Sequence, residues 1–278
     1  MNKMTDNTID TVYRYWNNNT LYSFEIKEEP GTKEFYDAID TLRRQDIEKF
    51  SIHLWKFDQM QGRKVLDIGC GPGWLVRNYA SNGADVYAVD IANKAIELTQ
   101  KMLDIFNLSA QLQVANAETL PFEDNTFDFV SSSGVLHHTP DMQKAVDEAF
   151  RVLKPGCEAV ISVYYKNILL NKALFPFVLS MFRLLKPDLP GRTRMFDAKN
   201  PDDFIRMYDG EDNPVGYGLT LSECKKMFSN FEIKGYEVHF FPKRFFTQFK
   251  SIPDFVHKLL DRHFGTMIYL KLRKPQND

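Results

Sequence analysis

The sequence predicts an α/β fold in which helices cover both faces of a mostly parallel sheet. A short apolar run at 64–68 leads into a turn with glycines at alternate positions, and an amphipathic pattern follows at once. This order of strand, glycine turn and helix forms the first half of a nucleotide-binding crossover. Strand and helix patterns then alternate as far as residue 165. Such alternation indicates right-handed crossovers between parallel strands, and strands that are apolar on both sides need helices on both faces.

The alternating region is divided by its hydrophobic periodicity, which differs between strands and helices. We expect strands at 64–68, 85–89, 110–114, 126–131 and 158–164, and helices at 73–81, 94–106 and 142–153. The turn Lys154-Pro155-Gly156 introduces the fifth strand.

The flanking regions have a different rhythm. Before the alternating region we expect a short helix within residues 1–20 and, from apolar residues near the 3.6 period, a helix over 32–60. After it we expect an apolar helix or helix pair over 167–186, kinked at Pro176, and then an ordered loop or lid over 187–218. The C-terminal part should form a helix over 220–228, a strand over 231–241, a helix within 242–263 and a strand over 266–272. The chain thus divides into an N-terminal helical extension or flap (1–60), a ligand-binding core (61–165), a lid insert (166–219) and a C-terminal completion of the sheet (220–278).

The composition excludes several classes of protein. The 278 residues are 44% hydrophobic, enough for a packed core, and the net charge of −2 lacks the basic surplus of a nucleic-acid-binding protein. Three widely spaced cysteines, Cys70, Cys157 and Cys224, fit neither a disulfide framework nor a zinc site. The N-terminus has no signal-peptide core, and the most apolar segment, 168–185, is too interrupted for stable membrane insertion. We therefore expect a cytoplasmic protein.

Two aspartates indicate which ligand the glycine turn holds. Dinucleotide-binding folds place a pyrophosphate at the helix N-terminus after Gly-x-Gly-x-x-Gly, whereas this turn has alternate glycines preceded by Asp67. A carboxylate there would repel a pyrophosphate and attract an ammonium or sulfonium cation. Asp90, at the end of the second strand, is placed to accept hydrogen bonds from ribose hydroxyls. By itself Asp90 would also suit a nicotinamide dinucleotide, or would merely cap the next helix.

Six short motifs stand in a characteristic order. They are Val-Leu-Asp-Ile-Gly-Cys-Gly-Pro-Gly (65–73), Val-Asp-Ile (89–91), Ala-Glu-Thr-Leu-Pro-Phe (117–122), Phe-Asp-Phe-Val (127–130), Val-Leu-His-His (135–138) and Arg-Val-Leu-Lys-Pro-Gly (151–156). Over residues 60–165 the chain therefore resembles the class I S-adenosylmethionine-dependent methyltransferases. It resembles in particular the small-molecule branch that includes the ubiquinone and menaquinone methyltransferases and many natural-product enzymes.

The resemblance implies a fold and a reaction. The fold is a Rossmann-like three-layer sandwich with a seven-stranded, mostly parallel sheet and one antiparallel strand, 266–272, beside 231–241. The cofactor is S-adenosyl-L-methionine, and its methyl group passes to an oxygen, nitrogen or carbon atom of a small-molecule acceptor by in-line displacement. No metal is required, and no ligand cluster in the sequence suggests one. We expect a monomer or a homodimer.

The resemblance also implies the cofactor contacts. The cofactor-binding residues would be Asp67 near the methionine amino group, Gly69, Cys70, Gly71 and Gly73 under the methionine and ribose, Asp90 on the ribose hydroxyls, Ile91, Asn116, Ala117 and Glu118 around the adenine, and Ser133 and Gly134 facing the methionine part and the methyl group. The family usually has an acid where Asn116 stands. The amide oxygen of Asn116 can still accept a hydrogen bond from the adenine amine.

The catalytic candidates are His137 and His138, at the carboxyl edge of the sheet. One imidazole could take a proton from the acceptor, and His138 is the preferred one. Alternatively both histidines only pack or cap the next helix, because positioning alone often suffices for this transfer.

The acceptor pocket is expected from the parts outside the core. The substrate-binding candidates are Tyr15, Trp16, Arg192, Arg194, Tyr208 and Tyr217. Arginine forks suit a carboxylate or phosphate on the acceptor, but salt bridges to Asp197, Asp202 or Asp203 are the commoner use. The apolar run 169–185 could line a pocket or a dimer interface, or could simply cover the sheet.

Two rival functions remain open. A nicotinamide-dependent oxidoreductase would share the crossover and Asp90, although Asp67 and the glycine spacing count against it. A non-catalytic module would bind S-adenosylmethionine without an acceptor pocket. Methylation of nucleic-acid bases is disfavoured because Ser131-Ser-Ser-Gly134 stands where those enzymes carry an Asn/Asp-Pro-Pro-aromatic signature.

Overall fold

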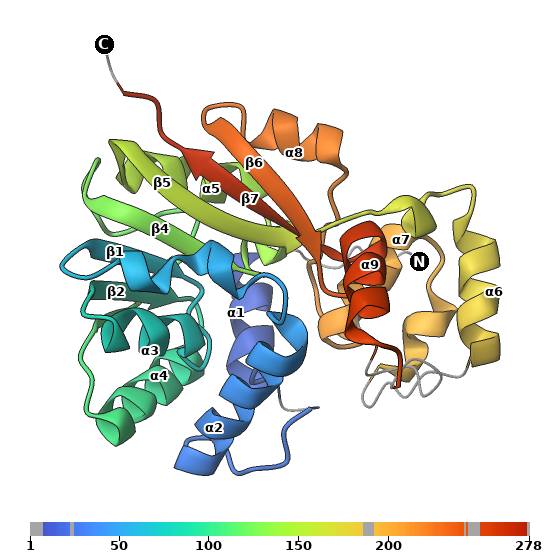
Figure 1. Ribbon diagram of the computed structural model, residues 1–278, viewed down its shortest axis with the longest axis horizontal. Coiled ribbons are helices and arrows are strands. Elements are labelled where there is room, and N and C mark those ends of the chain that lie inside the picture. Colours follow the sequence, from blue (N-terminus) through green and yellow to red (C-terminus); the bar gives the residue numbers. More distant parts are fainter. Residues whose placement is uncertain (1–7, 23–24, 186–191, 242, 244–250, 277–278) are drawn as a thin grey trace.

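The computed structural model describes residues 8–22, 25–185, 192–241, 243 and 251–276, and within them seven strands form one sheet (Figure 1). Across the sheet the order is β3 (Gln111–Val114), β2 (Asp85–Asp90), β1 (Lys64–Ile68), β4 (Phe127–Ser133), β5 (Leu153–Tyr164), β7 (Met267–Arg273) and β6 (Glu232–His239). The first five strands pair in parallel, and β7 runs antiparallel to both β5 and β6. The predicted sheet, with its antiparallel strand near the C-terminus, is confirmed.

The alternation of side chains along the strands divides the core into two halves. On β1, Val65 belongs to one half, whereas Leu66 and Ile68 belong to the other. The first half is covered by α2 (Lys33–Leu42), α3 (Trp74–Ser81) and α4 (Asn93–Phe106), and the second by α5 (Met142–Val152) and α8 (Leu221–Met227). Because β1 is buried on both faces, it reads as a continuous apolar run, and the predicted three-layer arrangement is confirmed.

Side-chain caps determine where several helices begin. Thr32 accepts a hydrogen bond from the backbone N–H of Phe35 at the start of α2. Asp141 does the same for α5, and Thr220 and Glu223 form a reciprocal capping box at the start of α8. Each cap pairs backbone N–H groups that have no partner within the first turn of the helix.

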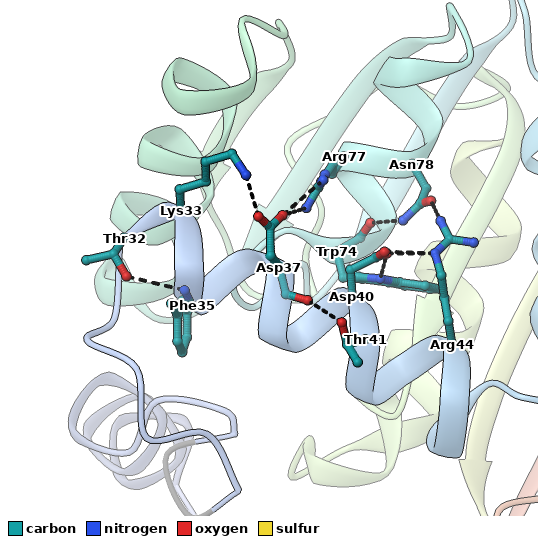
Figure 2. A network of polar contacts seen from close by, with 10 residues as sticks. All are labelled: Thr32, Lys33, Phe35, Asp37, Asp40, Thr41, Arg44, Trp74, Arg77 and Asn78. Carbon is teal, nitrogen blue, oxygen red and sulfur yellow. Dashed lines mark hydrogen bonds and ion pairs between the residues drawn. The ribbon is translucent and has the colours of Figure 1, made fainter.

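A network of polar contacts fastens α2 to α3, as Figure 2 shows. Asp40 accepts hydrogen bonds from the Trp74 indole and from Arg44, both at 2.9 Å. Arg44 also donates to the Asn78 amide oxygen at 2.5 Å. Because Arg43 immediately precedes Arg44, this attachment also fixes the place of the Arg43 side chain, which lies at a cavity described below.

The prediction of a single helix over 32–60 is wrong. The α-helix α2 ends at Leu42 and continues as one π-helical turn, Arg43–Ile47, in which the Glu48 N–H reaches back five residues to the Arg43 carbonyl. Two short 3₁₀ turns follow, at 52–55 and 57–59, separated by Lys56 in the left-handed region at φ +53°. The wider turn and the left-handed residue redirect the chain, so that the indole of Trp55 becomes fully buried.

The insert after β5 also differs from its prediction. Helix α6 (Phe175–Leu185) begins at Phe175, so Pro176 lies in its first turn, where its missing N–H costs no helical hydrogen bond and causes no kink. The predicted loop at 187–218 contains α7 (Pro201–Arg206), capped by the Asn200 side chain and flanked by 3₁₀ turns at 193–197 and 207–209. Residues 186–191 lie outside the described part of the chain.

Helix α6 does not cover the sheet, contrary to one of the interpretations of its apolar sequence. It stands with α7 and α9 (Asp254–Phe264) at one side of the molecule (Figure 1). Phe175 packs on Phe204 of α7, while Phe177 and Leu184 are 73% and 80% exposed. The expected helix within 242–263 begins only at Asp254, and residues 242 and 244–250 lie outside the described residues. Among the described helices none has the length and apolarity that a membrane span needs.

Candidate active site

Two adjoining cavities lie at the carboxyl ends of the parallel strands, where ligands of open α/β sheets bind. Their volumes are about 890 Å³ for the first and about 860 Å³ for the second, open mouths included. Ser133 and Gly134, at the end of β4, line both cavities, and so does Trp16 of α1 (Ile9–Asn18). The N-terminal helix, the core and the lid insert therefore meet at one place.

The glycine turn forms part of the wall of the first cavity. A Cβ on Gly69 would lie 2.3 Å from the Val135 side chain, so this position cannot carry a side chain without a rearrangement. A Cβ on Gly71 would meet only Leu21, at 3.6 Å, and would otherwise extend into open space. Gly73 does not line the cavity; it adopts φ +85° and caps α3. Gly71 is thus the position where exposed backbone faces a ligand.

Asp90 is the charged acceptor of the first cavity. Its Oδ2 accepts a hydrogen bond from the Gly71 N–H and its Oδ1 from the Ala92 N–H, both at 2.9 Å. These bonds fix the carboxylate on the glycine turn and use one acceptor position on each oxygen. Burial raises the pKa of Asp90, and the backbone N–H groups of Ala92, Gly71 and Ile91 oppose that rise. Both oxygens can still accept from a pair of neighbouring hydroxyl groups.

The predicted adenine contacts divide into two groups. Ile91, Asn116 and Ala117 line the first cavity. The amide oxygen of Asn116 accepts from the Glu118 N–H at 2.9 Å and so shapes the loop after β3. Glu118 does not line the cavity, because its carboxylate accepts from the Asp141 N–H at 2.8 Å and holds the start of α5.

Asp67 and Cys70 lie beneath the cavity wall. The Asp67 side chain is buried and accepts a hydrogen bond from the Ser131 hydroxyl at 3.0 Å. Burial raises the pKa of Asp67 to about 7, although the Ser131 hydrogen bond and the charge of Arg43 oppose the rise. Cys70 is buried beside the Thr99 hydroxyl. Neither side chain lines the cavity. Any influence of these residues on a ligand would therefore act through their backbone atoms or through the electrostatic field of Asp67.

The second cavity has aromatic walls and internally paired charges. Arg43 donates to Glu48 at 2.6 Å and to the Ser133 hydroxyl at 2.9 Å. Arg192 forms an ion pair with Glu25 at 2.6 Å. The aromatic side chains in its wall are Trp16, Tyr22, Tyr164, Tyr208, Phe240 and Tyr269.

Asp209 of the second cavity contacts a histidine of the first. It lines the second cavity, and its Oδ2 lies 3.0 Å from Nε2 of His138, which lines the first. Tyr164 donates its hydroxyl hydrogen to the same oxygen. Burial would raise the pKa of Asp209, but the hydrogen bonds from His138 and Tyr164 and the positive charge of Arg192 hold it below the usual range. Asp209 is therefore a carboxylate.

Both ring nitrogens of His138 have partners within the protein. Nδ1 lies 2.7 Å from the Val215 carbonyl, and Nε2 faces the Asp209 carboxylate. The Asn213 amide nitrogen also lies 3.3 Å from Nδ1, so protein groups engage both ring nitrogens of His138. In this arrangement it has no nitrogen free to take a proton, so the predicted role as general base does not follow from the geometry.

His137 is placed differently from His138. It is fully buried, lines neither cavity, and its Nδ1 accepts from the Tyr164 N–H at 3.3 Å. Burial and the neighbouring charge of His138 hold its pKa well below the usual value, so it is neutral. One possible metal-ligand atom from each of His137, His138 and Asp209 lies within 4.8 Å of the others, a grouping the sequence did not indicate. A metal ion would have to displace the present partners of a His138 nitrogen before binding there.

The predicted substrate residues are only partly brought together. Trp16, Arg192 and Tyr208 line the second cavity, and the hydroxyl of Tyr15 donates to the Asp209 carbonyl at 2.6 Å. Arg194 and Tyr217 line neither cavity. Arg194 lies instead 3.9 Å from Glu211 and from Asp212, and Arg206 bonds Asp203 at 2.8 Å. Arg206 thus forms one of the expected salt bridges, with Asp203, whereas Arg194 and Arg192 lie near other acidic residues.

Sequence reasoning missed Arg43, Tyr164 and Asp209. Arg43 lies in a segment whose pattern predicted only a helix, and Tyr164 lies at the end of a segment that predicted only a strand. Asp209 stands in an acidic, glycine-containing stretch that reads as surface loop. The one available signal was the pair Tyr208-Asp209, an aromatic beside an acid in the predicted lid.

Comparison with known proteins identifies the core. Residues 66–161 match the family model described as a methyltransferase domain. Over these residues the chain is similar to methyltransferase domains. Among curated proteins it is similar to the ubiquinone/menaquinone biosynthesis C-methyltransferase of Cronobacter sakazakii, with 34% identity over 142 residues, 46% of this chain and 57% of that protein. It is also similar to the malonyl-[acyl-carrier protein] O-methyltransferase of Erwinia billingiae, with 33% identity over 102 residues, 37% of this chain and 39% of that protein. The chain thus spans about half the length of the curated relatives it matches.

Solved structures extend the likeness of the methyltransferase domain to the whole fold. An S-adenosylmethionine-dependent methyltransferase of Mesorhizobium loti has a TM-score of 0.55 and 19% identity, over 80% of this chain and 96% of that one. One of Methanosarcina mazei has a TM-score of 0.53 and 23% identity, over 78% and 94%. The [4+2]-cyclase SpnF has a TM-score of 0.55 and 15% identity, over 96% and 92%. At these identities the likeness shows the fold alone, and a cyclase among them means that the reaction must be argued from the site.

Proposed function

We propose that this protein transfers the methyl group of S-adenosyl-L-methionine to a small-molecule acceptor. The observation that carries the proposal is the junction of the two cavities at Ser133 and Gly134. One cavity offers hydrogen-bond acceptors and apolar surface for a nucleoside. The adjoining cavity offers space for a second molecule. A cofactor-binding module without an acceptor site would need no second cavity.

The residues of the first cavity fit the cofactor. Asp90 has acceptor positions left for two ribose hydroxyls, and Gly71 leaves its backbone open to the ligand. Ile91 and Ala117 offer apolar surface for a purine ring. The alternate glycines of this turn differ from the Gly-x-Gly-x-x-Gly spacing that holds a pyrophosphate, which disfavours a nicotinamide dinucleotide.

The chain's own contribution is positioning and exclusion of water. When bound, S-adenosylmethionine supplies a methyl group on a sulfonium, a leaving group that needs no further activation. Holding two reactants in near-attack geometry is worth roughly 7–11 kcal/mol of the barrier. Trp16, which packs edge-on at 5.0 Å from the His138 ring, covers the junction of the cavities. A proton released by the acceptor would pass to the Asp209 carboxylate rather than to His138.

Calorimetric titration with S-adenosylhomocysteine and with NAD tests the cofactor. Binding of S-adenosylhomocysteine and not NAD is expected. Asp90→Ala should weaken that binding roughly tenfold or more, because a hydrogen bond to a charged group contributes ~1.5–3 kcal/mol. Asp85→Ala, at the exposed opposite end of β2, is the matched control and should bind as the wild type does. Binding of NAD alone, or unchanged affinity in Asp90→Ala, would refute the proposal.

We also place this activity in a reducing cytoplasm. The three cysteines form no disulfide, and Cys70 and Cys224 are buried. Burial raises the pKa of Cys224 to about 12, so its thiol stays protonated and unreactive. This supports the expectation drawn from their spacing.

A further inference from the structure

We propose that the second cavity binds a neutral aromatic acceptor that donates a hydrogen bond to Asp209, and that it rejects anionic acceptors. This assignment rests on the proposed function, since it names the molecule that receives the methyl group. It departs from the expectation that arginines of the insert recognise a carboxylate or phosphate. Three features of the cavity support it: its paired cations, its accessible carboxylate oxygen and its aromatic walls.

The cations of the cavity are already paired. Among the described residues that line it, the positively charged side chains are Arg43 and Arg192. Arg43 is bonded to Glu48 at 2.6 Å and to Ser133, and its guanidinium lies 4.2 Å from the centre of the Trp74 ring. Arg192 is bonded to Glu25 at 2.6 Å and to the backbone carbonyl of Tyr208.

An anionic acceptor would compete with Glu48 or Glu25 for a guanidinium, and taking either guanidinium would break one of these pairs. Arg43 and Arg192 are buried, and their partners Glu48 and Glu25 would then be left as buried charges without a counter-ion. Breaking a buried ion pair in this way is strongly unfavourable. The anion would also face Asp209, a like charge in a partly desolvated site.

Asp209 offers the cavity a carboxylate oxygen that can receive a hydrogen bond. Its Oδ2 is occupied by Tyr164 and by Nε2 of His138. In the described part of the chain its Oδ1 accepts no hydrogen bond, and the side chain is 14% exposed where it lines the cavity. A hydroxyl or N–H group on the acceptor can therefore donate to Oδ1, whereas a carboxylate has no hydrogen to donate.

The walls favour a flat ring. Tyr164 and Tyr208 lie edge to face with their ring centres 5.9 Å apart, and Phe240 packs on Tyr208 at 5.8 Å. Trp16 adds an indole at the junction with the first cavity. Aromatic rings contact one another well in offset and edge-to-face arrangements. A hydroxylated aromatic compound combines this contact with a donor for Asp209.

Isosteric probes separate charge from shape. The protein is first loaded with S-adenosylhomocysteine, and dissociation constants for 4-hydroxybenzamide, 4-hydroxybenzoate and benzamide are measured by NMR titration. We expect 4-hydroxybenzamide to bind at least about tenfold more tightly than 4-hydroxybenzoate, because juxtaposed like charges and broken ion pairs are costly. Benzamide, which lacks the hydroxyl donor, should also bind more weakly. Equal or tighter binding of 4-hydroxybenzoate, or binding of none of the probes, would overturn the assignment.

Asp209→Asn tests the residue assigned to discrimination. An amide can donate to a carboxylate, so the preference for 4-hydroxybenzamide over 4-hydroxybenzoate should shrink toward one. Asp212→Asn, an exposed position three residues away, is the matched control and should keep the wild-type preference. An unchanged preference in Asp209→Asn would refute the role of Asp209. Failure of the loading step would instead refute the proposed function, because S-adenosylhomocysteine binding is read separately.

Discussion

Replacing Asp67 by Asn should stabilise the ligand-free protein at alkaline pH and not at acid pH. The Asp67 carboxyl lies within β1, is 1% exposed and accepts one hydrogen bond, from Ser131. Burial raises its pKa from 3.8 to about 7, so the folded protein favours the protonated form. Asn has the same shape, keeps the acceptor for Ser131 and carries no charge to bury.

The size of the change in unfolding free energy follows from the raised pKa of Asp67. A carboxyl whose pKa is higher in the folded state contributes stability that is present below the unfolded pKa and is lost as pH rises through the folded pKa. For Asp67 the window runs from about pH 4 to about pH 7. At 1.36 kcal/mol for each pKa unit, the total loss is about 4 kcal/mol, of which roughly 2–3 kcal/mol falls between pH 5 and pH 8. The Asn variant lacks this loss.

Urea unfolding of both proteins at pH 5 and pH 8, followed by tryptophan fluorescence, measures the difference. Asp128→Asn supplies a control of opposite sign. Burial would raise the pKa of Asp128, but hydrogen bonds from Lys154 and from the Lys64 N–H hold it below the usual value. That variant should therefore lose stability at pH 8 relative to wild type. If the difference in unfolding free energy between wild type and Asp67→Asn is the same at both pH values, the reasoning about Asp67 fails.

Three further outcomes are expected. Gly69→Ala should destabilise the fold because its Cβ would lie 2.3 Å from Val135, whereas Gly71→Ala should mainly weaken S-adenosylhomocysteine binding. Thermal melts measure the first effect and calorimetry the second. Equal decreases in melting temperature for the two variants would contradict this. His138→Gln should lower turnover of an identified acceptor without weakening cofactor affinity, because Asp209 loses its contact with the imidazole. Unaltered kinetics would leave His138 as a packing residue. Dialysis against a chelator should leave turnover unchanged, since protein groups already engage both nitrogens of His138. Loss of activity restored by Zn²⁺ would show that the grouping with His137 holds a metal.

Much of the fold could be predicted from local signals. The boundaries of β1 and β2 agree with prediction within a residue, because their apolar runs end at glycine or aspartate turns. The helix expected over 32–60 could not be predicted correctly, since its apolar spacing is equally satisfied by separate turns that each bury a side chain. Which of these forms is chosen depends on the packing of Trp55 and Arg43, and those contacts are remote in sequence.

The candidate cofactor cavity was predicted better than the acceptor cavity for a physical reason. Gly71 and Asp90 lie directly after neighbouring parallel strands, and the pairing of β1 with β2 brings them together, with the Gly71 N–H 2.9 Å from the carboxylate. The second cavity, the candidate acceptor site, is lined by Trp16, Tyr164 and Asp209, which belong to three separate segments. No periodicity relates residues so far apart.

The sequence by itself determined the type of sheet, the glycine turn and the family of the core, because each depends on residues close together in the chain. Only the tertiary structure decided the polarity of the second cavity. It paired Arg192 with Glu25 across 167 residues and placed Asp209 against His138. The sequence left open that the arginines of the insert bind an anion. In the structure Arg192 is instead paired with Glu25, and the cavity presents the Oδ1 oxygen of Asp209. The partners that set a buried group's charge are chosen by the fold, and composition cannot reveal which cations remain unpaired.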